Sequence, residues 1–399
     1  LMEVDMYSTA TKQMPSDAGR DCLVLARGLR ERVADESAVI EREGRLPLEL
    51  VDELRQAGLF HMLLPRDLGG LEVDPVTAAQ VVEEIAKADG STAWCLMLAA
   101  QAAFFAGFLP RREALAIWGN GGIVAGTARP IGRAVWTEVP EPGYIVSGRW
   151  PFASGSSHAT WFGGECVVYD GERPRLDTDS NEVTRTLFVP RESVSVDDTW
   201  DTLGLRGTAS NDFSIENALV PAGRGFQVLV DPPLHDWALY RCAPLVFINH
   251  GSQAIGLGRG AIDAAAAIAQ RKLGWGNQPL RDIPRIQAAI AEATALVDSA
   301  ADYLYSSAGA LWESSLCGDA EPTLRARVRL ATSHAVKASV QAVDLLHATM
   351  ATSAIFRSSP LERQFRDIHT AAAHVMVGPL TYEAAGRALL GLEAGFPFF

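Results

Sequence analysis

Near the end of the chain stands the segment RDIHTAAAHV, residues 366–375. Its ionisable side chains are Arg366, Asp367, His369 and His374. The alanines between them favour a helix. Positions four and seven apart share one face of a helix, so we expect Asp367, Ala371 and His374 to point the same way. This segment is the first candidate for a functional site, and the pattern around it indicates the fold.

Helical periodicity surrounds this segment. We expect four long helices over residues 235–273, 281–316, 321–356 and 360–390. The apolar stripe of the third contains many alanines, which let helices approach closely, as in an antiparallel bundle. Residues 233–399 are therefore predicted to form a C-terminal four-helix bundle.

The regions before the bundle differ from it and from each other. Residues 1–120 have helical patterns, with Asp74-Pro75 and Asp89-Gly90 as helix starts. Residues 121–232 have short apolar or alternating runs separated by Gly, Pro, Asp and Asn, which is typical of an antiparallel β barrel or sandwich. The predicted fold class is mainly α with a central β domain, in the order helical domain, β domain, four-helix bundle.

Composition argues against several classes of protein. The net charge of -13 argues against nucleic acid or an anionic membrane as partner. The five cysteines are scattered without metal-ligand spacing, so we expect reduced thiols and no metal site. The most apolar stretch, residues 93–109, includes Gln101 and many small residues, and we expect a buried helix there rather than a membrane span. The first residues show no signal-peptide pattern, so we expect a cytoplasmic protein.

Four motifs, in this order, resemble those of the acyl-CoA dehydrogenase superfamily. They are LPRDLGG (64–70), GLRGTASN (204–211), AIGLGRGA (254–261) and the pair Arg366-Asp367. Each motif alone is weak, but together they extend over nearly the whole chain. The resemblance implies the same three-part architecture and a homotetramer.

The catalytic glutamate of the dehydrogenases is missing from both positions where the superfamily places it. In many members it lies nine residues after the Arg of the Arg-Asp pair, where this chain has Val375. In others it precedes an Arg of the first bundle helix, where this chain has Tyr240 before Arg241. Glu383 lies too late in the sequence to match either position.

His374, next to the missing glutamate, instead resembles the flavin-dependent monooxygenases of this superfamily. These are oxygenase components of two-component systems and include hydroxylases of p-hydroxyphenylacetate and of a steroid-derived phenol. The segments DGSTAW (89–94) and GRWPFASGSSHA (148–159) extend the resemblance. It implies reduced FMN or FAD as cosubstrate, O2, and a C4a-hydroperoxide kept in a dry pocket.

The resemblance assigns catalytic roles to two residues. A serine on the β domain hydrogen-bonds flavin N5, which corresponds to Ser154, and a bundle histidine faces the substrate, which corresponds to His374. A histidine with a pKa of about 6.5 can take a phenolic proton near neutral pH. His369 is a second candidate for this role. The expected reaction is hydroxylation of an aromatic small molecule, phenolic or polycyclic.

The same resemblance suggests further contacts with the cofactor. The candidates are Trp94, Trp150, Phe152, Arg206, Thr208, Ser210 and Arg271. The three aromatic side chains either flank the flavin ring or pack in the core. Arg271 either reaches the flavin phosphate of a neighbouring subunit or is an exposed surface arginine. No GxGxxG motif follows a strand, so the implied electron source is a separate NAD(P)H:flavin reductase.

Three alternatives use the same scaffold. An N-hydroxylase of an amine, such as an amino sugar, needs acidic groups for the ammonium. An acyl-CoA dehydrogenase with a displaced base needs a roomy channel for coenzyme A. A non-catalytic flavin-binding relative leaves the reoxidation rate of reduced flavin unchanged.

Overall fold

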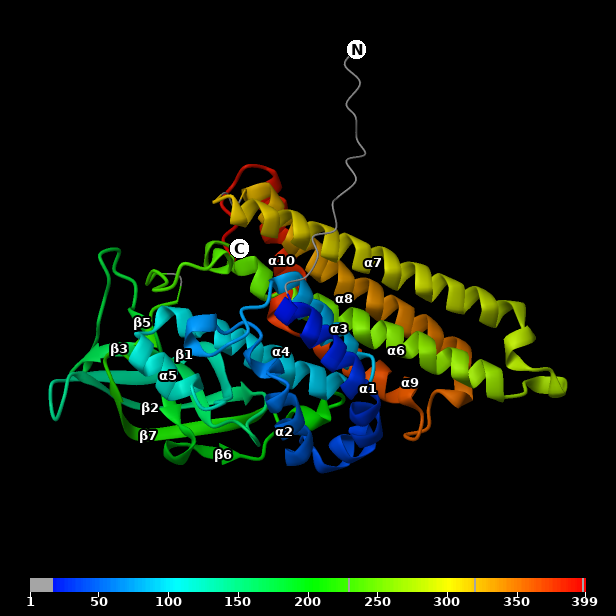
Figure 1. Cartoon of the computed structure of the whole chain (residues 1–399), viewed down its shortest axis with the longest axis horizontal. Helices are drawn as coiled ribbons and strands as arrows, with labels where there is room; N and C mark the ends of the chain where they lie inside the picture. The colour runs from blue at the N-terminus through cyan, green and yellow to red at the C-terminus, as the bar shows by residue number, and fades with distance from the viewer. Residues whose placement is uncertain (1–16, 229, 319–320, 397) are drawn as a thin grey trace, which may run out of the picture.

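A computed structural model describes residues 17–228, 230–318, 321–396 and 398–399 (Figure 1). Residues 1–16 of the predicted N-terminal domain lie outside the described residues. Helices come first, a sheet follows, and long helices complete the chain. The predicted fold class is confirmed.

The described part of the N-terminal region, from Asp17 on, contains five α-helices. They are α1 (Asp17–Glu43), α2 (Leu48–Gln56), α3 (Pro75–Ala86), α4 (Gly90–Phe104) and α5 (Arg111–Trp118). The predicted caps are confirmed, because the Asp74 and Asp89 side chains accept hydrogen bonds from the backbone N–H of Thr77 and Thr92. A 3-10 turn (Phe105–Phe108) and Pro110, which has no N–H for a helical hydrogen bond, separate α4 from α5.

Helix α4 is buried, as expected. With the short 3-10 turn that follows it, the stretch Gly90–Phe108 is long and apolar enough to cross a membrane, but 78% of it is buried inside the protein. In Figure 1 it lies between the sheet and the bundle, and it contacts β1 (Val124–Thr137), α6 (Asn249–Arg271) and α9 (Pro360–Ala372). Side chains of α4 can therefore meet residues from both of the other regions.

The central region is one eight-stranded sheet. Its strands, after β1, are β2 (Gly143–Ala153), β3 (Trp161–Asp170), β4 (Arg173–Pro174), β5 (Thr184–Pro190), β6 (Ser195–Asp197), β7 (Asn211–Pro221) and β8 (Gly225–Phe226). The order is β6-β7-β2-β1-β3-β5-β8, and β4 pairs with β3. The prediction of a wholly antiparallel domain is wrong at one pair, because β1 and β3 are parallel. The connection from β2 to β3 crosses to the other edge of β1, which gives β3 the direction of β1.

Long helices form the bundle. They are α6, α7 (Pro284–Leu316), α8 (Pro322–Met350), α9, and α10 (Pro379–Leu389). Helix α6 begins fourteen residues later than the predicted start at His235, because irregular 3-10 turns and Pro244 precede it. Its glycines serve packing, as expected: a Cβ on Gly256 would come within 2.5 Å of the Glu83 carbonyl oxygen on α3.

The fourth predicted helix, residues 360–390, is in fact two. Helix α9 ends at Ala372, and His374 has extended backbone angles of φ -71 and ψ 136. Pro379 fixes the start of α10, because its ring excludes a helical hydrogen bond and disfavours helical geometry at Gly378. It lies seven residues after the end of α9, so it does not explain the extended backbone of His374. The expectation that His374 continues the helical face of Asp367 and Ala371 is therefore wrong. The interruption turns His374 away from the α9 surface.

Candidate active site

A chain of hydroxyl groups lies where the β domain meets α4. Ser154, in the turn after β2, is 3.1 Å from Trp94 Nε1 and 2.6 Å from Ser210 Oγ. Ser210 Oγ is in turn 2.6 Å from Thr208 Oγ1, which donates to the Leu205 carbonyl at 2.9 Å. The structure thus brings together four residues that the sequence analysis had assigned to the cofactor.

One assignment of the hydroxyl protons satisfies every contact in this chain. In it Thr208 gives its single hydroxyl proton to Leu205. Ser210 then donates to Thr208, and Ser154 donates to Ser210. Trp94 Nε1 can only donate, so it donates to Ser154. Ser154 retains an acceptor lone pair but has no free proton.

Two imidazole rings complete this site on the bundle side. His250, in the first turn of α6, stacks on His374 with a centroid separation of 4.5 Å and an interplanar angle of 20°. The Trp94 ring meets both edge-on, at 5.4 Å from His250 and 5.5 Å from His374. Residues from α4, α6 and the α9–α10 interruption therefore share one aromatic cluster, which we call the histidine cluster (Trp94, His250 and His374).

Both histidines of the cluster are neutral at pH 7. Burial, aided by the charge of Arg329, lowers the pKa of His374 to about 4. Burial also lowers the pKa of His250 well below 6.5, with smaller contributions from His374 and Arg329. His374 Nδ1 accepts a long hydrogen bond, 3.4 Å, from the backbone N–H of Met376, which places the proton on Nε2. In this geometry His374 is a hydrogen-bond donor and a weak base.

Asp367 positions the loop that carries the hydroxyl chain. Its Oδ1 accepts from the backbone N–H of Leu205 at 2.6 Å, which joins α9 to the segment before Thr208. Leu205 and Ala209 both have positive φ, of 51° and 44°, on either side of this segment. Such strained backbone persists only where surrounding contacts hold it. Burial, and then the nearby Asp89 charge, raises the pKa of Asp367 to about 7.

Several residues predicted for the site lie elsewhere. Trp150 is fully buried in the core of the sheet, stacked on Phe213, so core packing is its observed role. Phe152 is 55% exposed, at a positive φ, near the Ser154 turn. His369 Nε2 bonds to Asp344 Oδ1 on α8 at 2.8 Å, and none of its described contacts is with the histidine cluster.

The two predicted arginines lie on the surface. Arg206 is bound to the Thr202 carbonyl at 3.0 Å and to Asp201 at 3.4 Å, and it lies beside Glu41. Arg271 is exposed at the end of α6 and forms no hydrogen bond or ion pair with the described part of the chain. Their roles in phosphate binding stay predictions.

The sequence patterns did not predict two further candidates for the site, His250 and Arg329. His250 had one usable signal, a polar Asn-His pair at the start of an Ala- and Gly-rich helix. Arg329 gave no such signal. Arg325 and Arg327 lie just before it on the same helix, and nothing in the sequence pattern separates a buried arginine from an exposed one.

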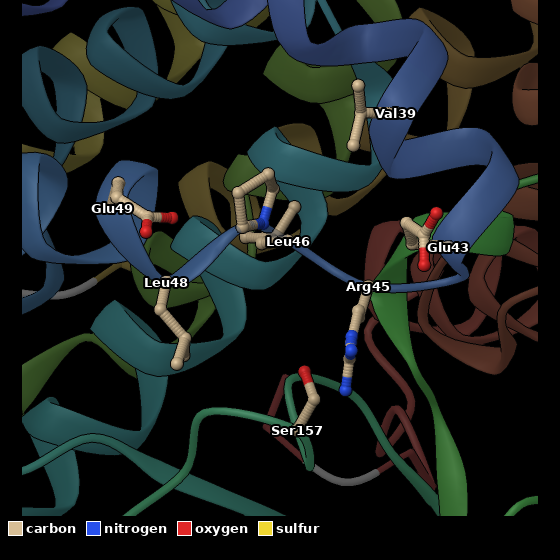
Figure 2. Close-up of a pocket in the computed structure, with 8 residues that line it drawn as sticks. Val39, Glu43, Arg45, Leu46, Leu48, Glu49 and Ser157 are labelled. Atoms are coloured by element: carbon tan, nitrogen blue, oxygen red, sulfur yellow. The ribbon is translucent and has the colours of Figure 1, made fainter.

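Two cavities lie outside the histidine cluster. One, of about 310 Å³, lies between the α1–α2 junction and the Ser154 turn, and Arg45 extends toward Ser157 there (Figure 2). The other, of about 290 Å³, lies against α10 and is lined by Glu383 and Phe396. Glu383, considered above as a displaced base, therefore faces this second cavity.

Comparison with known proteins identifies the family. The N-terminal domain model of acyl-CoA dehydrogenases matches residues 24–108, and the C-terminal domain model matches residues 248–379, together more than half of the chain. The chain belongs to the acyl-CoA dehydrogenase superfamily. The indole-3-acetate monooxygenase of Pseudomonas putida is 29% identical over 92% of this chain and 93% of its own length. The oxygenase subunit HsaA, a flavin-dependent monooxygenase of Rhodococcus jostii, is 29% identical over 88% of this chain and 92% of its own.

A solved relative within the superfamily has the same fold. XiaF from Streptomyces, in complex with FADH2 and glycerol, superposes with a TM-score of 0.85 at 24% identity, over 95% of this chain and 97% of that one. That relative holds FADH2, and the residues described here are chemically suited to a flavin. Ser154, in a half-buried turn, offers a lone pair as a hydrogen-bond acceptor. The indole of Trp94 beside it offers an aromatic edge, and together they suit a polar ring system.

Proposed function

We propose that this chain is the oxygenase component of a two-component flavin-dependent monooxygenase that hydroxylates an aromatic small molecule. The observation that carries the proposal is the joining of the Ser154 hydroxyl chain to the histidine cluster through Trp94. Trp94 is in contact with both an acceptor suited to a cofactor, Ser154, and the neutral imidazoles suited to a substrate.

Ser154 is the residue that we propose to hold the flavin at N5. Reduced flavin has a hydrogen on N5, and the free lone pair of Ser154 can accept it. Thr208 and Ser210 keep the Ser154 hydroxyl in this orientation, and Trp94 fixes it from the other side. A bound reduced flavin supplies the two electrons and the site of oxygen activation.

His374 is the residue that we propose to face the substrate. A neutral imidazole with its proton on Nε2 can orient an aromatic hydroxyl or heteroatom by donating a hydrogen bond. Acting as a base toward a phenol requires the other tautomer, which gives up the bond from Met376 N–H. The buried aromatic surroundings keep water away from this position.

The geometry favours this function over the alternatives. Val375, at one expected position of the dehydrogenase glutamate, is 58% exposed. At the other, Tyr240 donates its hydroxyl to the Phe104 carbonyl. The positive charge of Arg329, which acts on both histidines, would repel the ammonium group of an N-hydroxylase substrate. The proposal includes a separate flavin reductase as electron donor, and it keeps the homotetramer and the flavin role of Arg271 as predictions.

The test uses labelled oxygen. The protein and chemically reduced FMN or FAD are mixed under anaerobic conditions, then exposed to ¹⁸O₂ in the presence of aromatic candidates. We expect a product that has gained one ¹⁸O atom, with less hydrogen peroxide released than by flavin in buffer. An unlabelled substrate pool, with flavin reoxidation as fast as in buffer, would contradict the proposal.

A further inference from the structure

Arg329 of α8 is a buried cation without a counterion. Its side chain is 1% exposed, and Nη2 donates to the Met376 carbonyl at 3.3 Å. Nε and Nη1 have no hydrogen-bond partner among the described residues, so the three N–H groups on these two nitrogens are unused. No carboxylate within the described ranges forms an ion pair with it.

The guanidinium stays charged in this environment. Burial lowers the pKa of Arg329 only to about 10, so the side chain is protonated at neutral pH. A buried charge without a partner is among the least favourable arrangements in a folded protein. Chains keep such a charge where a ligand supplies the counter-charge, and a guanidinium suits a carboxylate because its N–H groups bind both oxygens.

Arg329 lies next to the proposed substrate side of the site. Met376, which it contacts, is two residues from His374, and the charge of Arg329 lowers the pKa of both cluster histidines. Phe396 covers one face of the guanidinium, with its ring centroid 5.2 Å from the Arg329 Cζ atom. The guanidinium therefore has an aromatic side chain over it and lies close enough to the histidine cluster for its charge to act on both imidazoles.

We propose that Arg329 binds the carboxylate of the substrate, and that the substrate is an aromatic acid whose ring lies against the histidine cluster. This inference rests on the proposed function, because that function places the substrate beside His374. A flavin phosphate is the other anion available. Arg329 contacts the carbonyl of Met376, two residues from His374, so we assign Arg329 to the substrate side.

Paired ligands test the inference by binding alone. Calorimetry compares indole-3-acetate with indole-3-acetamide, and phenylacetate with phenylacetamide, on protein with and without reduced flavin under anaerobic conditions. We expect the wild-type protein to bind at least one acid about tenfold or more tightly than its amide, as expected for a hydrogen bond between charged groups. Arg329→Gln should reduce that ratio to near one, and Arg329→Lys should give an intermediate ratio.

Arg327→Gln is the matched control. Arg327 is exposed on the same helix, over the Tyr303 ring, and its loss should leave the acid-to-amide ratio unchanged. The inference is overturned if the wild-type protein shows no preference for any acid or binds none at millimolar concentration. It is also overturned if Arg329→Gln keeps the preference, or weakens binding of reduced flavin instead.

Failure of the proposed function gives a different result. If tighter binding of the acid than of its amide depends on Arg329, but no aromatic compound acquires ¹⁸O, then the anion site is supported and the monooxygenase reaction is contradicted. If a neutral aromatic acquires ¹⁸O and no acid preference exists, the reaction stands and the role of Arg329 is wrong.

Discussion

His250 and His374 stack with their ring centroids 4.5 Å apart, although they lie at opposite ends of the bundle sequence. Two charged imidazoles would repel at this distance, and burial already disfavours the charged form of each. The stack is therefore stable as a neutral pair. It fixes the His374 ring plane, which no helix holds.

The first prediction concerns His374. Replacement by Ala should lower the rate of aromatic hydroxylation by about 100-fold or more, the usual range for a residue that handles a proton in catalysis. Binding of reduced flavin should change little, because none of the described hydrogen bonds of Ser154 is with His374. Product formation by mass spectrometry and flavin binding by anaerobic titration measure the two effects. His369→Ala, which removes a contact with Asp344, is the control and should keep the wild-type rate. Equal losses in both variants would show that the helix, not the cluster, was damaged.

The second prediction concerns Ser154. Ser154→Ala should weaken the binding of reduced flavin about tenfold, the value of roughly one hydrogen bond, and that of oxidised flavin less. Equilibrium titration of both oxidation states measures the difference. Ser157→Ala removes an exposed hydroxyl from the same turn and should leave both affinities unchanged. An equal effect of Ser154→Ala on both flavin forms would rule out an N5–H contact.

Asp367 leads to a prediction about pH. Its pKa is raised from 3.8 to about 7 in the folded protein, so the folded state holds a proton that the unfolded chain has lost. The stability of the folded protein that depends on protonated Asp367 is fully present below pH 4 and is lost as the pH rises to about 7. Asp367→Asn can still accept from the Leu205 N–H but does not titrate. Urea unfolding at pH 4 to 8 should show the wild-type protein losing stability relative to this variant as pH rises.

The comparison with the variant is needed because other groups act in the opposite direction. The pKa of His374 is lowered to about 4, so its contribution is full above pH 6.5 and is lost as pH falls toward 4. This contribution is common to both proteins and cancels in the difference. A difference that stays constant from pH 4 to 8 would mean that Asp367 titrates normally.

Gly207 provides a prediction about packing. A Cβ at this position would overlap Ile40 and come within 3.1 Å of Ser91 Cβ, so Gly207→Ala should destabilise the protein by roughly 1 to 3 kcal/mol. Gly309→Ala is the control, because no atom lies within 4 Å of a Cβ there and the residue is inside α7. Replacing this glycine should stabilise the protein by up to about 1 kcal/mol. Thermal unfolding of both variants measures the contrast, and destabilisation by both would contradict it.

The fold followed closely from the sequence where local rules apply. The caps at Asp74 and Asp89 marked helix starts, and alternation marked the strands. Pairing of β1 with β3 was not predictable, because strand periodicity does not show which strand is the neighbour. Pro379 marked the start of α10 in the sequence, but no local signal showed that α9 ends at Ala372 and that His374 is extended.

The candidate site was only partly predictable. The motifs led to Ser154, Trp94, Thr208, Ser210 and His374, which the structure brings together through hydrogen bonds and ring contacts. His250 and Arg329 depend on which face of a helix is buried and on what lies opposite. That information comes from tertiary packing, which no local pattern contains.

The hydroxyl chain from Trp94 to Leu205, with its protons assigned as above, has an electrochemical consequence for the proposed flavin site. Reduced flavin can donate from N5, and oxidised flavin cannot, so a serine without a spare proton favours the reduced form. By thermodynamic reciprocity, we expect a flavin bound at Ser154 to have a higher midpoint potential than in water. One hydrogen bond of about 1 kcal/mol corresponds to roughly 20 mV for two electrons. The protein would thus bind the flavin more tightly while it is reduced and release it more readily after it is oxidised.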